Sequence, residues 1–372
     1  MIYFDHNATS PLHPAARAAW LEASEKLIGN ASSLHRLGSR ADAALERARV
    51  DVASLLGCNP TDIVWTSGAT EANNTVIHHF AKSVTAERKE LWISPIEHPS
   101  VVEPGRAHFG KNLRFLPVSA AGVVELEPLG VLLRKRKPAG VAVMAANNET
   151  GVLQPWSEIA DLCREHGVPF FTDAVQRVGK LPSAGLGNCD FVSASAHKFG
   201  GPKGVGFLKT PTTTPLRPLL HGGPQEFGRR AGTENVAGVL ATVAALKARD
   251  AAATSALLAA KQQFERDLIQ HLPGAKVIGA DAPRLWNTTM VLLPATDACF
   301  RWVVKLDKAG FAVSTGSACS SGEEKPSHVL TAMGFTPEEI SRTIRISAGW
   351  ETTADDYNAL LRALSELLAS AR

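Results

Sequence analysis

The sequence predicts an α/β fold, in which a mainly parallel sheet forms a large domain and a smaller α/β lobe follows it. The chain has 372 residues, which is enough for about two domains at roughly 150 residues each. From about residue 60 onward, short apolar runs alternate with amphipathic stretches. This alternation is typical of strands and helices in a doubly wound parallel sheet.

Seven apolar runs are expected to form the strands of the large sheet. They are Asp62–Thr66, Leu91–Ser94, Leu113–Pro117, Val141–Ala146, Pro169–Asp173, Asp190–Ala194 and Gly204–Lys209. Helices are expected between them. Ser157–His166 is one example, with Ser157 as the N-cap and Gly167 as the terminator.

The second half of the chain has its own set of expected elements. After the Pro- and Thr-rich stretch Thr210–Pro218, a long Ala-rich helix from about Glu234 to Leu268 is expected to connect the lobes. The smaller lobe then contains the strands Thr288–Leu293 and Thr343–Ser347, the helix Cys299–Gly310, and a final helix from Ala354, capped by Thr352 or Thr353. That helix is expected to run almost to Arg372.

The charge and composition exclude several classes of protein. Lys plus Arg is 39 and Asp plus Glu is 36, giving a net charge of +3, and 45% of residues are hydrophobic. A disordered chain or a basic nucleic-acid binder would differ in these values. No apolar run approaches the roughly 20 residues of a membrane span, and Asp5 and His6 stand where a signal peptide would be apolar. We therefore expect a cytoplasmic protein with neither a membrane nor a nucleic acid as a direct partner.

The five cysteines are expected to be reduced. An odd number of widely spaced cysteines does not indicate a disulfide framework, and without a C-x-x-C pair no metal site is expected. Cys319 differs from the others because it lies in a Gly/Ser segment, residues 314–322, where a thiol is expected to be exposed and mobile. For the remaining four we expect packing roles: Cys58, Cys163, Cys189 and Cys299.

Polar residues at the ends of three expected strands are candidates for a ligand site, because ligands of open α/β sheets bind at the carboxyl ends of strands. Ser67-Gly68-Ala69-Thr70 could bind a phosphate at a helix N-terminus, although the same pattern is also a capping signature. Asp173 could hold a protonated ring nitrogen or simply cap a turn. Lys198 could be a nucleophilic amine, or an exposed lysine in a surface hairpin.

Taken together, these three features fit one ligand, pyridoxal 5′-phosphate (PLP). Its phosphate needs N–H and hydroxyl donors, its pyridinium nitrogen needs a carboxylate, and its aldehyde needs a lysine. The G-x-x-x-x-G-K and G-x-G-x-x-G motifs are absent, so ATP and NAD are less suitable ligands.

The sequence also resembles a known family, the cysteine desulfurases of the NifS/IscS type. These are class V aminotransferases with the aspartate-aminotransferase-like fold type I of PLP enzymes. The resemblance covers essentially the whole chain. It is carried by the motifs TSGATEANN (66–74), EHPSV (97–101), NNETG (147–151), TDAVQ (172–176), SASAHKFGGPKG (193–204), RRAGTEN (229–235) and STGSACSSG (314–322).

The resemblance implies a role for each matching residue. Lys198 would form the Schiff base with PLP, Asp173 would pair with its ring nitrogen, His98 would stack on the ring and assist proton transfer, and Gln176 would bond the ring hydroxyl. The cofactor would also contact Ala69, Thr70, Asn148, Ser195 and His197. Thr233 would complete the phosphate site of a neighbouring subunit, which implies a homodimer. Asn148 and Arg345 would bind the substrate carboxylate.

The implied reaction converts L-cysteine to L-alanine and leaves the sulfur on Cys319 as a persulfide for an acceptor protein. Residues 14–255 would form the large PLP-binding domain, and residues 1–13 and 256–372 the small domain that carries Cys319. The sequence lacks the extended C-terminal tail with which iron–sulfur members of the family dock their scaffold protein. The acceptor therefore stays open between iron–sulfur cluster assembly and thiolation of tRNA or another target.

Two other functions remain open. A selenocysteine lyase or another PLP-dependent β-eliminating lyase would not need Cys319. A sulfur-carrier or assembly subunit with a degenerate cofactor site would not need Lys198, Asp173 and His98, all of which are present.

Overall fold

The computed structural model describes residues 1–249, 251–295, 301–315 and 326–370. Its larger part is built on a seven-stranded sheet of order β2-β8-β7-β6-β5-β3-β4. The strands are β2 (Ile63–Thr66), β3 (Leu91–Ile93), β4 (Leu113–Phe115), β5 (Gly140–Ala142), β6 (Phe170–Asp173), β7 (Phe191–Ser195) and β8 (Gly206–Lys209). Only the pairs that include β8 are antiparallel among these strands, so the prediction of a mainly parallel sheet is confirmed.

Seven helices belong to this larger part. They are α1 (Pro14–Lys26), α2 (Arg36–Leu56), α3 (Ala69–Lys82), α4 (Pro99–Phe109), α5 (Leu126–Lys135), α6 (Trp156–Glu165) and α7 (Val236–Lys247).

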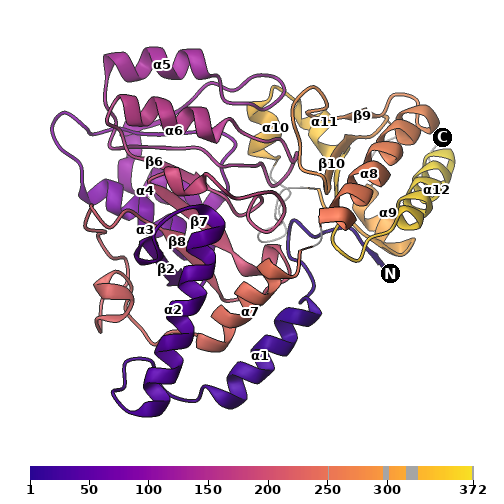
Figure 1. Cartoon of the computed structure of the whole chain (residues 1–372). Helices are drawn as coiled ribbons and strands as arrows, with labels where there is room; N and C mark the ends of the chain where they lie inside the picture. The colour runs from indigo at the N-terminus through magenta and orange to yellow at the C-terminus, as the bar shows by residue number, and fades with distance from the viewer. Residues whose placement is uncertain (250, 296–300, 316–325, 371–372) are drawn as a thin grey trace.

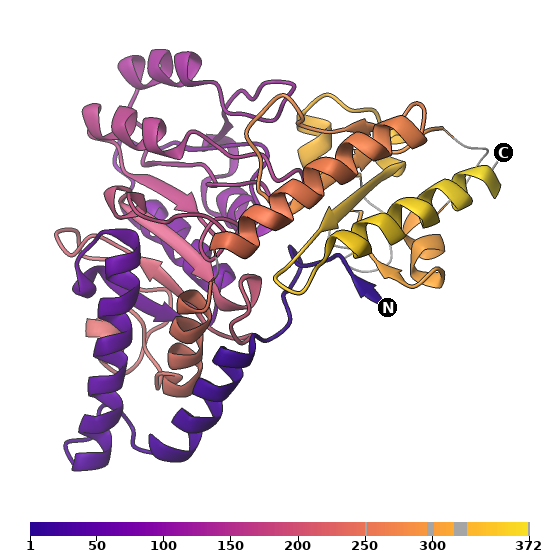
Figure 2. The same ribbon diagram turned by 45° about the vertical axis from the view of Figure 1, so that its right-hand side comes forward.

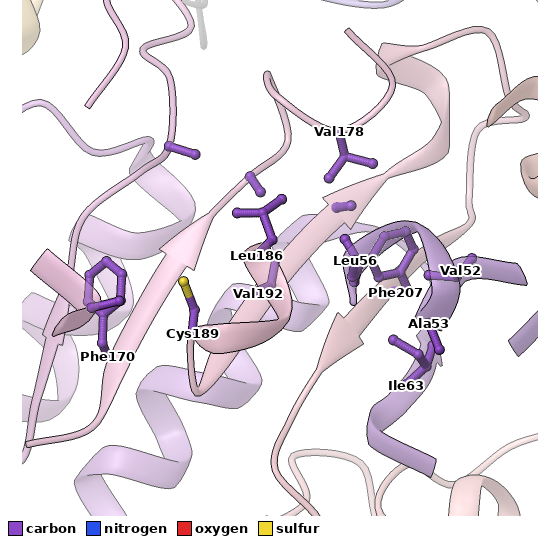
Figure 3. Close-up of a cluster of buried hydrophobic side chains, with 14 of the residues drawn as sticks. Val52, Ala53, Leu56, Ile63, Phe170, Val178, Leu186, Cys189, Val192 and Phe207 are labelled. Atoms are coloured by element: carbon purple, nitrogen blue, oxygen red, sulfur yellow. The ribbon is translucent and has the colours of Figure 1, made fainter. Parts of the chain in front are cut away.

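Helices cover the large sheet on both faces because its strands alternate apolar side chains between them. In β6, Phe170 belongs to a core with α2, α5, α6 and α7, whereas Phe171 belongs to a second core with α3 and α4. Figure 3 shows part of the first core, where Ile63 and Phe207 of the sheet meet Leu56 of α2. The central strands of the sheet are therefore buried on both sides, whereas the edge strand β4 is partly exposed.

The smaller part contains a three-stranded antiparallel sheet, β12-β10-β9, and the parallel pair β1-β11. The strands are β1 (Ile2–Tyr3), β9 (Lys276–Val277), β10 (Thr288–Leu292), β11 (Phe311–Ala312) and β12 (Thr343–Ser347). The helices are α8 (Ala251–His271), α9 (Trp302–Lys308), α10 (His328–Ala332), α11 (Pro337–Ser341) and α12 (Ala354–Ser370).

The first residues of the chain belong to this smaller part. α8 and α12 lie side by side there, and the N-terminal strand lies in the same region (Figures 1 and 2). Phe4 is fully buried in the core that contains Phe264 and Tyr357. From this strand the chain runs to α1 on the large part, as Figure 2 shows.

Some expected boundaries were wrong. The predicted helix from Glu234 to Leu268 is two helices: α7 packs on α1 in the large part, and α8 packs on α12 in the small part. The lobes are therefore joined at the break after Ala248, the C-cap of α7. Helix α6 begins at Trp156 with Pro155 as its N-cap, so Ser157 does not cap it.

Other expectations were confirmed. β12 has the predicted bounds, and the final helix begins at Ala354 with the Thr353 hydroxyl accepting from the Asp356 N–H at 3.2 Å. The start of the helix expected from Cys299 lies outside the described residues. Among the residues that the structure describes, no helix is both long and apolar enough to cross a membrane.

Candidate functional site

The predicted site residues gather along the carboxyl ends of neighbouring strands in the large sheet. β2 leads to the turn before α3, β6 ends at Asp173, β7 ends at Ser195, and the segment after β5 carries Asn148. A chain segment from the small part, around Asn7, lies on the same edge, because Lys198 donates to its carbonyls. Both parts of the molecule therefore contribute to one site.

The turn at residues 67–70 has the geometry of an anion site. Gly68 is the N-cap of α3 and makes no side-chain capping hydrogen bond, while the Ser67 N–H donates to Glu71 Oε2 at 2.9 Å, so the pattern does begin the helix as the capping alternative expected. A Cβ at Gly68 would lie 3.4 Å from the Ser195 Oγ, which places that hydroxyl beside the turn. Ala69 is buried, and Thr70 is exposed in the first turn of the helix, where backbone N–H groups lack intrahelical partners.

Asp173 is a buried carboxylate held by two donors. Its Oδ2 accepts from Asn73 Nδ2 at 2.8 Å, and its Oδ1 accepts from the Val175 N–H at 3.0 Å. The hydrogen bond from the Val175 N–H caps the turn, as expected from the alternative interpretation of Asp173 as a turn cap. The carboxylate thus caps its turn and also lies among the site residues.

Lys198 ends the 3₁₀ turn Ala196–Lys198 after β7 and is not an exposed hairpin lysine. Its Nζ donates to the carbonyl oxygens of Asn7 and Ala8, each at 2.8 Å. Burial, together with the positive charge of Arg345, lowers the pKa of Lys198 to about 8, although Asp173 and Asp5 oppose the shift. A substantial fraction of this amine is therefore neutral near physiological pH.

Two histidines stand beside this lysine. His98 is the N-cap of α4, where its Nδ1 accepts from the Ser100 N–H at 3.1 Å. Burial lowers the pKa of His98, and the negative charge of Asp173 opposes that shift. His197 Nδ1 lies 3.2 Å from Thr9 Oγ1, and burial lowers the His197 pKa to about 4. Both rings are therefore neutral at pH 7.

Arg345 comes from β12 and is 4% exposed. Its Nη2 pairs with Asp5 Oδ1 at 2.7 Å, and its Nη1 donates to the main-chain oxygen of Asn148 at 3.0 Å. The Asn148 Oδ1 atom is buried and has no hydrogen-bond partner among the described residues. An arginine fork and an unsatisfied amide oxygen are groups that could hold an amino acid.

Gln176 lies in a network that the sequence did not predict. Its Nε2 donates to the Asn7 carbonyl at 3.0 Å, and its Oε1 accepts from Lys180 Nζ at 2.5 Å. Asn7 is 1% exposed and also bonds to Thr288 Oγ1 at 2.9 Å in the small part. Nothing local in the sequence shows that Asn7 connects the two parts of the molecule.

Thr233 is exposed and lies away from the buried part of the site. It lines a surface hollow with Thr66, Ser67, Gly204 and Arg230 of its own chain. The structure thus brings Thr233 near the phosphate turn of the same chain, while leaving it accessible to another molecule.

Three of the five cysteines lie in the part of the chain that the structure describes, and all three are buried or half-buried. Cys163 and Cys189 are buried in a hydrophobic core, and burial raises the pKa of each thiol to about 12. Cys58 is half-buried, and burial raises its pKa to about 11. These thiols are poor nucleophiles at neutral pH. Cys299 and Cys319 lie outside the described residues.

Comparison with known proteins identifies the family. The aminotransferase class-V model matches residues 2–360. The chain is 35% identical to the cysteine desulfurase IscS of Dictyoglomus turgidum over 379 residues, which covers 100% of this chain and 95% of that protein. It is 37% identical to the cysteine desulfurase NifS of Azotobacter vinelandii, covering 100% and 93%. A solved NifS-like protein superposes with a TM-score of 0.88 at 31% identity, and the match covers 99% of both chains.

Proposed function

The chain belongs to the class-V aminotransferase family, and from that membership we propose that it is a PLP-dependent cysteine desulfurase. The reaction is L-cysteine plus a protein thiol giving L-alanine plus a protein persulfide. One observation carries the proposal furthest: Lys198, Asp173 and the turn at residues 67–70 lie at one edge of the large sheet, and Lys198, Asp173 and Arg345 are each held by hydrogen bonds or an ion pair.

The residues present fit PLP. The turn at residues 67–70 with Ser195 would hold the phosphate, Asp173 would pair with the ring nitrogen, and Lys198 would bond the aldehyde. His98, His197, Gln176, Asn148, Ala69 and Thr233 complete the proposed contacts. When bound, PLP supplies a ring that withdraws electrons from the substrate Cα.

The remaining steps belong to this chain's own residues. Arg345 and Asn148 would hold the substrate carboxylate, with the carboxylate replacing Asp5 on the Arg345 fork. The Lys198 amine, with its lowered pKa, would take the Cα proton. The Cys319 thiolate would attack the substrate sulfur, so that an S–S bond forms as the C–S bond breaks. The substrate carbon keeps the C–S electron pair and takes up a proton to give alanine.

A homodimer is part of this proposal, with Thr233 completing the site of the second subunit. Several large apolar side chains of α1, α2 and their connection are exposed, as expected for a surface that a second copy covers. They are Trp20 41%, Leu21 53%, Ile28 72%, Leu34 101% and Leu37 42%. A cytoplasmic location, a protein acceptor for the sulfur and the domain boundaries 14–255 against 1–13 and 256–372 also remain proposals. The separate hydrophobic cores of the two parts support a division into two domains, with the break between α7 and α8 lying a few residues before the proposed boundary at residue 255.

The test is turnover of L-cysteine by the purified protein in the presence of a reducing thiol, with alanine and sulfide measured. Cys319→Ala is expected to lose sulfide release, and Lys198→Ala to lose both products, whereas Cys163→Ala, which changes a buried thiol, is expected to retain most of the activity. Unchanged turnover in Cys319→Ala would exclude the persulfide route.

A further inference from the structure

Lys180 is a buried lysine beside the site that the proposed reaction does not use. It lies after β6 and is 4% exposed. Its Nζ donates to Asn7 Oδ1 at 2.6 Å and to Gln176 Oε1 at 2.5 Å. Both acceptors are neutral amide oxygens. A buried lysine without a bonded carboxylate is costly to keep, so the contacts it makes call for a functional explanation.

These contacts determine which way the Gln176 amide points. A lysine nitrogen with hydrogens directed at both amides can only be satisfied by their oxygens. With Oε1 turned toward Lys180, the Gln176 amino group faces the opposite side, where it donates to the Asn7 carbonyl at 3.0 Å. The same carbonyl accepts from Lys198 Nζ at 2.8 Å. The Gln176 amino group therefore lies on the side of the reacting lysine and has a second N–H.

We propose that Lys180 is a positioning residue that holds the Gln176 oxygen, so that Gln176 presents an N–H donor to the ring oxygen of the cofactor. This inference rests on the proposed function, because it assigns the orientation of one contact in that site. Turning the amide over would place two donors, Lys180 Nζ and Gln176 Nε2, against each other and Gln176 Oε1 against the Asn7 carbonyl oxygen, so that both hydrogen bonds of the amide would be lost.

The inference makes a spectroscopic prediction. Bound PLP absorbs visible light, and its spectrum changes when its chromophore loses a proton. The deprotonated form carries more negative charge, and a donor on the ring oxygen stabilises it, so losing that donor raises the midpoint pH. Loss of one hydrogen bond to a charged oxygen corresponds to a shift of about one pH unit. The other charged or titratable groups near Lys180 are His6, Lys198 and Arg345.

A comparison in two backgrounds separates positioning from a direct charge effect. Lys180→Met is introduced into the otherwise unsubstituted holoenzyme and into the Gln176→Ala variant. The absorbance of bound PLP is then recorded from pH 6 to pH 10 for each protein. We expect the midpoint to rise by about one unit in the first background and to stay within about 0.2 unit in the second. Lys209→Met, which removes another buried lysine bonded to the Cys189 carbonyl at 2.7 Å, is the matched control and is expected to leave the midpoint unchanged.

Where the methionine variant does not fold, Lys180→Leu, which also lacks a hydrogen-bond donor, replaces it and the same comparison with Gln176→Ala decides. An unmoved midpoint in Lys180→Met, or an equal shift with and without Gln176, would overturn the inference while leaving the proposed function in place. Failure of the unsubstituted protein to bind PLP would overturn both, so the two failures are distinguishable.

Discussion

Glu97 is a buried carboxyl one residue before His98. It is 0% exposed, and its Oε1 accepts from Ser94 Oγ and from the Met144 N–H at 2.7 Å. Its Oε2 atom has no partner among the described residues. Burial raises the pKa of Glu97 to about 8, against the opposing effect of these hydrogen bonds. The carboxyl is therefore protonated in the folded protein at pH 7.

This protonation makes stability depend on pH. Below pH 4.5 both the folded and the unfolded chain hold the proton, whereas between pH 4.5 and about pH 8 only the folded chain does. The contribution of Glu97 to stability is thus lost as pH rises, by at most about 1.4 kcal/mol per unit. Glu97→Gln is expected to fold and to show a smaller loss of Tm from pH 6 to pH 9 in thermal melts. Parallel melting curves for the two proteins would contradict this prediction.

Single residues also show what the sequence could and could not predict. Lys198 and Asp173 were identifiable because a charged side chain directly after a buried strand is unusual. Lys180 and Asn7 were not, because their partners are other polar groups far away in the sequence. The role of such a residue depends on tertiary contacts, which a local pattern does not contain.

At the scale of elements, the β2–α3 turn depends on a glycine. Gly68 has φ +151°, which other residues rarely adopt, and its neighbour is Ser195 Oγ. The helix that follows has 14 residues, so its N-terminal dipole is fully developed. Backbone shape and a helix N-terminus together suit the turn to the phosphate-binding role that we propose for it.

Gly68→Ala is expected to lower PLP affinity by about 5-fold to 150-fold, because strain of roughly 1–3 kcal/mol falls on the turn itself. The measurement is a PLP titration of the cofactor-free protein. Gly167→Ala is the control, since Gly167 has φ +62° and open space around it and lies away from the site residues. It should lose thermal stability and keep its affinity for PLP. Equal affinities in all three proteins would show that the turn does not bind the cofactor.

The segment before Thr233 is held by a buried ion pair. Glu226 accepts from Arg49 Nη1 at 2.9 Å and Nη2 at 3.1 Å, and from the Trp65 N–H at 2.9 Å. Glu226 and Phe227 both have positive φ, 50° and 58°, and the Phe227 ring lies 5.3 Å from the Arg49 guanidinium. This strained turn persists because its carboxylate is fully satisfied.

Arg49→Ala is expected to destabilise the protein by about 3–5 kcal/mol, since it leaves the Glu226 carboxylate buried without its ion-pair partner. Lys247→Ala breaks an exposed ion pair to Asp51 and is expected to cost less than about 1 kcal/mol. Urea unfolding of both variants gives the comparison. A small loss in Arg49→Ala would mean that another group neutralises Glu226.

Elements were predicted better than their ends. The seven strands of the large sheet were found because apolar runs between helical patterns mark buried parallel strands. The break between α7 and α8 was missed because the sequence around Ala248 contains neither glycine nor proline. The two helices separate because each packs on a different core, and that choice is a property of the whole molecule.

At the scale of the whole molecule, a dimer allows two arrangements: Thr233 completes the phosphate site of its own subunit or that of the second subunit. In the described structure it lines a hollow with Ser67 of the same chain, while the proposal assigns it to the partner. Mixing two inactive variants distinguishes these arrangements. If Thr233 completes the site of the other subunit, a hybrid dimer of Lys198→Ala and Thr233→Ala has one site in which both residues are intact.

After unfolding and refolding of an equal mixture, activity is expected to reach up to about one quarter of the unsubstituted level, because half of the dimers are hybrids with one intact site. Each variant refolded alone is the control and should stay near its own low activity. A mixture no more active than the average of its components would place Thr233 in its own subunit's site.

The N-terminal strand has a consequence for the order of assembly. Ile2 pairs with Phe311, and Asp5 bridges to Ser347, so residues 2–5 can reach their folded positions only after the segment up to Ser347 has been made. The carbonyls that accept from Lys198 belong to Asn7 and Ala8, which directly follow these N-terminal residues. The large sheet can form while translation continues, but Lys198 gains these two acceptors only once the segment around Ser347 is in place. The hydrogen bonds that hold the Lys198 amine are therefore among the last contacts of the large part to form.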